Sequence, residues 1–261
     1  PAWTKEKYMP VNQQEARPAD VYVRLLGPVE LRCGDKLICE SRGRESLPWM
    51  LLKYLLVNRD REVDMAELDA VLWTTRGGES TSEGNARVRL SRLRKTLEPL
   101  NLDRRGGQSL IIYYSGRFSI NRSYGLAFDT DELLSLVRSE RDLPLDDADA
   151  MPKCARALEV YRGQFLSCSA PAPWLDVYRE QYAELFRALA ARTLERIKTT
   201  GDESALDLLC SRSAELAPED TELNDAIVAY LMERKMQIEL VRHVSRLSAA
   251  QKSPAAERRE A

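Results

Sequence analysis

Positive charge gathers between Asn85 and Arg122. This stretch holds nine arginines and lysines against two acidic residues, Glu98 and Asp103. Lysine and arginine neutralise phosphates, and arginine, asparagine and small apolar side chains also contact base edges in the major groove of DNA. The composition therefore favours recognition of a polyanion, although a basic helix face of this kind is also common where it is merely solvated.

A helix over residues 81 to 97 sorts these side chains onto two faces. At 100° per residue, Ala86, Leu90, Leu93 and Leu97 form an apolar seam that must face a core. The opposite face carries Val88, an exposed apolar residue among arginines, which is unusual for a solvated surface and favours DNA contact. The predicted base-contacting residues are Asn85, Val88 and Arg92, and the predicted backbone-contacting residues are Arg87, Arg89, Arg94 and Lys95.

The elements around this helix predict a winged helix-turn-helix. Three short strands, separated by glycine turns, are expected within residues 21–26, 29–33 and 36–39, followed by a helix over Leu47–Val57. Asp64 is expected to cap a second helix, whose apolar stripe lies before Trp73 and which Gly77-Gly78 terminates. Residues 110–114 and 117–120 predict a hairpin with a tight turn at Ser115-Gly116. Arg117 at its tip is placed to reach a minor groove, or else is an ordinary exposed loop arginine.

After Gly125 the pattern becomes almost purely helical. Residues 201–234 span 34 positions, the period of a tetratricopeptide unit. Six helices are expected, over residues 131–141, 148–161, 174–199, 203–216, 220–235 and 237–250. The predicted fold class is mainly α with small β-sheets: an N-terminal winged helix-turn-helix and a C-terminal all-α repeat similar to tetratricopeptide repeats. The expected divisions are a flexible leader at 1–20, the winged helix at 21–124, the repeat at 125–250 and a disordered tail at 251–261.

Charge and composition narrow the function classes. Residues 20–125 carry a net charge of +4 and residues 126–261 a net charge of −7, although the whole chain is only −2. Opposite charges permit the acidic half to shield the basic helix. The five cysteines are scattered and His243 is the single histidine, so no metal site, disulfide framework, cofactor or catalytic residue is predicted. No apolar run reaches membrane-spanning length and no signal peptide is evident, so a cytoplasmic location without membrane contact is expected.

Several segments also resemble one known family. Residues 88–99 resemble the recognition helix of OmpR/PhoB-type winged helices, and residues 23–31 with 68–73 look like the first strand and second helix of SARP-type bacterial activators. The second half is similar to the bacterial transcriptional activator domain that follows the winged helix in that family. This similarity is carried by residues 128–129, 157–166, 174–179 and 217–222.

The resemblance implies a transcription regulator, usually an activator, that binds direct repeats of double-stranded DNA and contacts RNA polymerase. It matches Val88 and Arg92 to base-contacting positions, and it matches Arg89, Ser91 and Arg94 to backbone-contacting positions. The helical repeat is expected to serve dimerisation, giving a homodimer, or polymerase contact or signal sensing. Two features depart from the family. The wing is shorter than usual, and Glu239, Arg242 and His243 stand where small or apolar residues are preferred, so this end is either an interface or packed differently.

Two other functions remain open from the sequence. In the first, the chain is a protein-interaction scaffold whose winged helix has lost DNA binding. The retained Asn85, Arg89, Arg92 and Arg94 argue against it, because a degenerate reader should carry acidic or bulky apolar residues there. In the second, the chain is the output half of a longer signalling protein. An enzyme is not expected, because the sequence lacks a phosphate-binding glycine loop and metal-ligand spacing.

Overall fold

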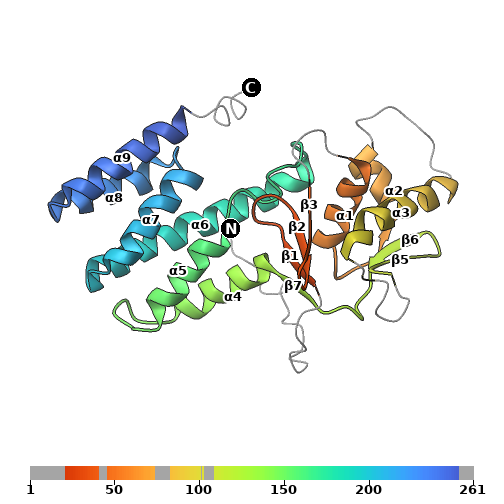
Figure 1. The fold of residues 1–261 in the computed structure, drawn as a ribbon, viewed down its shortest axis with the longest axis horizontal. Helices are drawn as coiled ribbons and strands as arrows, with labels where there is room; N and C mark the ends of the chain where they lie inside the picture. The colour runs from red at the N-terminus through yellow and green to blue at the C-terminus, as the bar shows by residue number, and fades with distance from the viewer. Residues whose placement is uncertain (1–20, 41–45, 74–82, 101, 103–108, 253–261) are drawn as a thin grey trace.

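The computed structural model of the 261-residue chain describes residues 21–40, 46–73, 83–100, 102 and 109–252, with side chains left out for residues 73 and 83–86. An N-terminal half of strands and helices is followed by a C-terminal half built of helices (Figure 1). The predicted fold class is confirmed, because the chain is mainly helical and combines a winged helix with a helical repeat.

The first sheet joins the start of the chain to the beginning of the helical half. Its order is β3-β2-β1-β7, with β1 and β7 parallel and the other pairs antiparallel. The three predicted N-terminal strands are present, whereas β7 was not predicted. Because β7 lies beyond Gly125, the sheet includes residues from both sides of the expected boundary at 124/125. The strands are β1 Val21–Arg24, β2 Glu30–Cys33, β3 Lys36–Cys39 and β7 Leu126–Phe128.

The helix-turn-helix follows this sheet. Helix α1 covers Leu47–Val57 as predicted, and Asp64 caps α2 (Met65–Leu68) by accepting a hydrogen bond from the Glu67 amide at 2.7 Å. The prediction of one continuous α-helix ended by Gly77-Gly78 was wrong from Asp69 on, because the backbone changes to a π-helical turn, η2, over Asp69–Trp73; residues 77 and 78 lie outside the described part of the chain. Helix α3 is described from Glu83 to Leu97, and residues 81 and 82 lie outside the described part of the chain.

A second, antiparallel sheet forms the wing. Its order is β4-β6-β5, with β4 at Val63–Asp64, β5 at Ile111–Tyr114 and β6 at Arg117–Ile120. The predicted hairpin is confirmed. Ser115 and Gly116 both have positive φ angles, 47° and 80°, as a two-residue turn between twisted strands requires. Strand β4 was not predicted, since two residues carry no periodicity of their own.

Six helices make up the described second half, close to the predicted ranges. Helices α7 and α8 begin with Asp202 and Asp220 as caps, each accepting from the amide three residues on. Helix α9 packs on both of them. No helix in the described part of the chain is long and apolar enough to cross a membrane. The helices are α4 Asp129–Arg141, α5 Ala150–Val160, α6 Pro173–Thr200, α7 Glu203–Leu216, α8 Thr221–Glu233 and α9 Gln237–Gln251.

Buried polar contacts hold the two halves together. The carboxylate of Asp129 accepts hydrogen bonds from the backbone amides of Leu25 and Leu26 at 2.9–3.0 Å. Lys53 on α1 pairs with Glu40 at 2.5 Å and donates to Ser169 at 2.7 Å. Helix α3 lies at the end of the molecule away from α7–α9 (Figure 1), so the acidic helices do not shield the basic helix in this arrangement.

Candidate nucleic-acid interface

The apolar seam of α3 fixes the direction of its basic face. Leu90, Leu93 and Leu97 are buried, with Leu93 fully inaccessible, and the helix packs on α1 and β5. This is the seam predicted from the sequence, apart from Ala86, whose side chain lies outside the described residues. Because one face is held in the core, the opposite face must point to solvent.

That solvent face carries most of the predicted contact residues. Val88 is 50% exposed, so an apolar side chain stands on this face among the basic ones. The sequence has no acidic residue from Arg87 to Leu97, so positive charge predominates along this part of the helix. Asn85 lies on α3, but its side chain is outside the described residues. The exposed polar residues on this face are Arg87, Ser91, Arg92, Arg94 and Lys95.

Arg89 occupies a different environment from the other basic residues of α3. Its Nη1 atom lies 3.4 Å from Oδ1 of Asp69 in the π-helical turn, and its side chain is only 16% exposed. Arg89 and Arg92 also line a small pocket with Leu47 and Leu51 of α1. Arg92 remains exposed, whereas Arg89 connects α3 to the preceding helix.

A polar contact holds α2 against α1. The hydroxyl group of Tyr54 donates to Oε1 of Glu67 at 2.5 Å, and Arg61 forms an ion pair with the same carboxylate. The hydrogen bond from Arg61 lowers the pKa of Glu67, while burial and the Glu67 carboxylate raise the pKa of Tyr54 to about 12. Both groups therefore keep this bond at neutral pH, and α2 stays fixed against α1.

The wing places Arg117 at the expected position. Arg117 follows the turn, is 61% exposed and pairs with an equally exposed Glu62 at 3.1 Å. Beneath it, Tyr113 and Phe118 pack with ring centroids 4.6 Å apart. An ion pair between exposed groups contributes little, about 0–1 kcal/mol, so a phosphate can compete for Arg117.

Sequence reasoning missed the outer face of the wing. Tyr114 is 80% exposed and lies directly across the hairpin from Arg117, and Ile112 on the same strand is 41% exposed. The signal was present in the alternation of β5, because if Ile111 and Tyr113 point inward, Ile112 and Tyr114 must point outward. An aromatic side chain beside Arg117 adds a second group that can meet a nucleic-acid backbone.

Metal binding was also tested against the geometry. Within the residues that the structure describes, no group of three or more His, Cys, Asp or Glu side chains is arranged to hold a metal ion. His243 is buried, with Nδ1 3.2 Å from the carbonyl oxygen of Cys210, and desolvation lowers its pKa. It therefore packs as a neutral side chain between α7 and α9.

Comparison with known proteins gives one informative likeness. No family model and no curated protein matches the sequence. Among solved structures, the chain is similar to Mycobacterium tuberculosis EmbR, determined in complex with a low-affinity phosphopeptide, with a TM-score of 0.53 and 16% sequence identity. The match covers 91% of this chain and 70% of that chain. At this identity the likeness shows a shared fold, a winged helix followed by helical repeats.

Proposed function

We propose that this protein is a sequence-specific DNA-binding transcription regulator of the SARP type that places α3 in the major groove. The observation that carries the proposal is the solvent face of α3, where the half-exposed Val88 stands among exposed arginines while the opposite leucines are buried. In a helix-turn-helix this face meets base edges. The shared fold with EmbR and the resemblance of the motifs along the chain support the same conclusion.

Within this proposal the basic residues have two roles. Arg92 can form two hydrogen bonds with a guanine, Val88 can contact a thymine methyl group, and Asn85 can read adenine. Arg87, Arg94 and Lys95, together with Ser91, contact phosphates and supply affinity that depends on salt. Arg117 on the wing approaches the adjacent minor groove. The activator role, a contact with RNA polymerase and recognition of direct repeats follow from the resemblance and belong to the proposal.

The test is binding of the intact chain to random duplexes, followed by selection and sequencing, with affinities measured over a salt series. Arg92→Ala should cost about 1–3 kcal/mol on the selected site and relax the preference at one base position. Arg234→Ala, an exposed arginine at the end of α8, is the matched control and should leave binding unchanged. Absence of salt-dependent binding would remove the proposal and favour the protein-interaction scaffold.

A further inference from the structure

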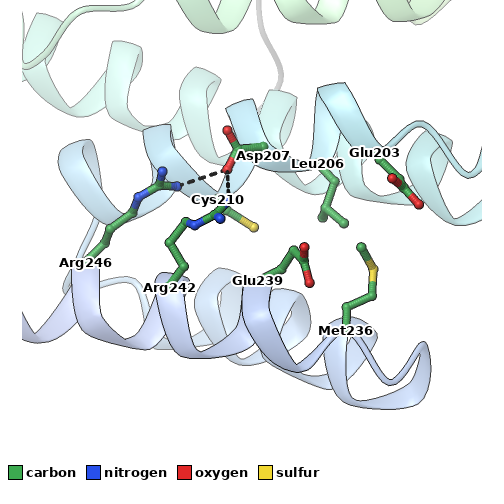
Figure 2. A pocket seen from close by; sticks show the side chains of 8 residues that line it. All are labelled: Glu203, Leu206, Asp207, Cys210, Met236, Glu239, Arg242 and Arg246. Carbon is green, nitrogen blue, oxygen red and sulfur yellow. Dashed lines mark hydrogen bonds and ion pairs between the residues drawn. The ribbon is translucent and has the colours of Figure 1, made fainter.

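A groove between α7 and α9 brings charged and apolar side chains together (Figure 2). Its volume is about 130 Å³, whereas pockets for drug-sized ligands begin at roughly 300 Å³. Glu239 and Arg242, two of the three departures from the resembled family, line this groove. The third departure, His243, is buried and packs on α7. Two of the departures thus form the wall of a cavity whose size suits only a small molecule.

Two arginines share one carboxylate at one end of the groove. Arg242 and Arg246, which we call the arginine end, approach the same atom, Oδ1 of Asp207, at 3.5 and 3.4 Å. Each guanidinium group carries five N–H donors, more than these two contacts use. A single carboxylate also leaves one of the two positive charges at this end without compensation. The arginine end can therefore bind a second carboxylate, supplied by a ligand.

Two glutamates line the groove near the starts of the two helices. Glu203 on α7 and Glu239 on α9, which we call the glutamate end, extend from opposite walls (Figure 2). Neither carboxylate has a hydrogen bond or an ion pair with any residue that the structure describes. Each lies in the first turn of its helix, where the helix dipole favours the ionised form. The glutamate end therefore keeps a negative charge that a cationic group can neutralise.

The rest of the groove is lined by an apolar floor, formed by Leu206, Cys210 and Met236. The side chains of Leu206 and Cys210 are almost fully buried, and Met236 lies on the α9 side (Figure 2). Burial raises the pKa of the Cys210 thiol to about 12, so this thiol is uncharged at neutral pH. Metal ions bind the thiolate rather than the thiol. The floor therefore suits an apolar group of a ligand rather than a metal ion.

The two charged ends lie about one helical turn apart. Glu239 and Arg242 are three residues apart on α9, which corresponds to a rise of about 4.5 Å. An α-amino acid carries its ammonium and carboxylate groups on one carbon atom, so the two groups can reach long side chains at this spacing. A phosphate would instead meet the glutamate end as a like charge, and a simple cation would meet the arginine end. A small zwitterion matches both ends.

We propose that this groove binds a free α-amino acid with an apolar side chain. The carboxylate of the amino acid contacts the arginine end, its ammonium group contacts the glutamate end, and its side chain lies on the apolar floor. Because the charged side chains of the groove are partly exposed, the affinity should be modest, with a dissociation constant on the order of 1 mM. The helical half thereby gains a small-molecule site that is separate from the basic face of α3.

Amide NMR spectra of the full chain, recorded without DNA, test the site with L-leucine as the probe. L-leucine should shift signals of α7 and α9 in a saturable manner. Two analogues separate the charged ends: 4-methylpentanoate lacks only the ammonium group, and 3-methylbutylamine lacks only the carboxylate. Each should bind about tenfold more weakly than L-leucine, because the contacts of one charged group are lost. Absence of saturable shifts with L-leucine, or equal binding of either analogue, overturns the proposal.

Substitutions at the two ends assign each contact to one group of the ligand. Glu239→Gln should weaken L-leucine by about three- to tenfold but should not weaken 4-methylpentanoate, which has no ammonium group. Arg242→Gln should weaken L-leucine by a similar factor but should not weaken 3-methylbutylamine, which has no carboxylate. Glu215→Gln, at an exposed glutamate of α7 outside the groove, is the matched control and should bind L-leucine like the wild type.

The variants also distinguish a direct contact from a change in the fold. Circular dichroism of all three should match the wild type. If Glu239→Gln weakens L-leucine and 4-methylpentanoate equally, the carboxylate does not contact the ammonium group, and the proposal is wrong. The comparison of L-leucine with its analogues on the wild type stands even if a variant does not fold. No measurement involves DNA, so failure here is distinct from failure of the proposed function.

Discussion

Nη1 of Arg89 lies 3.4 Å from Oδ1 of Asp69, and this ion pair connects α3 to the π-helical turn at the end of the preceding helix. Both side chains are mostly buried, at 16% and 24% exposure. The sequence assigns Arg89 to the DNA backbone together with Arg94, but the structure gives these two arginines different surroundings. Arg94 is exposed, whereas Arg89 is held against the protein.

Salt dependence should separate the roles of these two arginines. Arg94→Ala should weaken binding to all sequences and lower the slope of log K against log salt by about one, because one phosphate contact is lost. Arg89→Ala should weaken binding because α3 is no longer held in position by the ion pair with Asp69. The slope should change less than for Arg94→Ala. Affinity measured at four or five salt concentrations checks both expectations.

The substitution Asp69→Asn should change the affinity for DNA in opposite directions, depending on which of two roles Arg89 has. If Arg89 positions α3, loss of the ion pair should lower affinity for DNA. If Arg89 instead contacts phosphate, removal of the competing carboxylate should raise affinity. A tighter complex with Asp69→Asn would therefore contradict the positioning role.

Asp129 should make stability depend on pH. Burial raises its pKa from 3.8 to about 6, despite the hydrogen bonds from Leu25 and Leu26. The folded state therefore holds a proton that the unfolded state has released between these pH values. By linkage, this group makes the protein less stable as pH rises from about 4 to 6, by an amount on the order of 3 kcal/mol in total.

The contribution of Asp129 can be isolated with Asp129→Asn. Glu30 and Glu67 have lowered pKa values and act in the opposite direction, so their stabilisation is lost as pH falls. Their effects cancel in the difference between wild type and variant. Urea unfolding at several pH values should show the wild type losing stability relative to Asp129→Asn from pH 4 to 6. A difference that stays constant with pH would show that the pKa of Asp129 is not raised.

The buried ion pair of Lys53 and Glu40 predicts a large loss of folding stability when one partner is removed. Their side chains are 1% and 4% exposed, so Lys53→Met leaves a buried carboxylate without its counter-ion. The expected loss in unfolding free energy is about 3–5 kcal/mol, and adding Glu40→Gln should recover much of it. Arg156→Ala removes an arginine that is 53% exposed from its ion pairs and should cost less than about 1 kcal/mol. Equal losses for Lys53→Met and Arg156→Ala in urea unfolding would contradict this account.

Local sequence patterns were sufficient to predict most of the helices and the apolar seam of α3. Helices α1 and α7 match their predicted bounds because apolar periodicity and end signals coincide, with Pro48 in the first turn of α1 and Asp202 as the cap of α7. Leu90, Leu93 and Leu97 are buried as their spacing predicts. Such features depend on neighbours within a few residues, which a single sequence shows directly.

The missed features depend on contacts between distant segments. Strands β4 and β7 contain two and three residues and exist because they pair with β6 and β1, respectively. The ion pair of Arg89 with Asp69 requires the π-helical turn, which has no sequence signature. Asp129 was expected outside the following helix, yet α4 begins at Asp129, whose carboxylate accepts hydrogen bonds from the backbone amides of Leu25 and Leu26.

The wing provides a final prediction, because Glu62 holds Arg117 at 3.1 Å while both side chains are 61% exposed. Glu62→Gln should strengthen binding to every duplex by about two- to threefold at low salt, since it frees Arg117 and removes one negative charge near the phosphates. Tyr114→Ala, across the hairpin, should weaken binding without changing the salt slope, because tyrosine carries no charge. Fluorescence anisotropy over a salt series measures both effects.

Glu132→Gln, at a carboxylate on α4 beside Arg156, is the control for charge removal away from the wing. If Glu132→Gln and Glu62→Gln strengthen binding equally, the wing does not approach DNA.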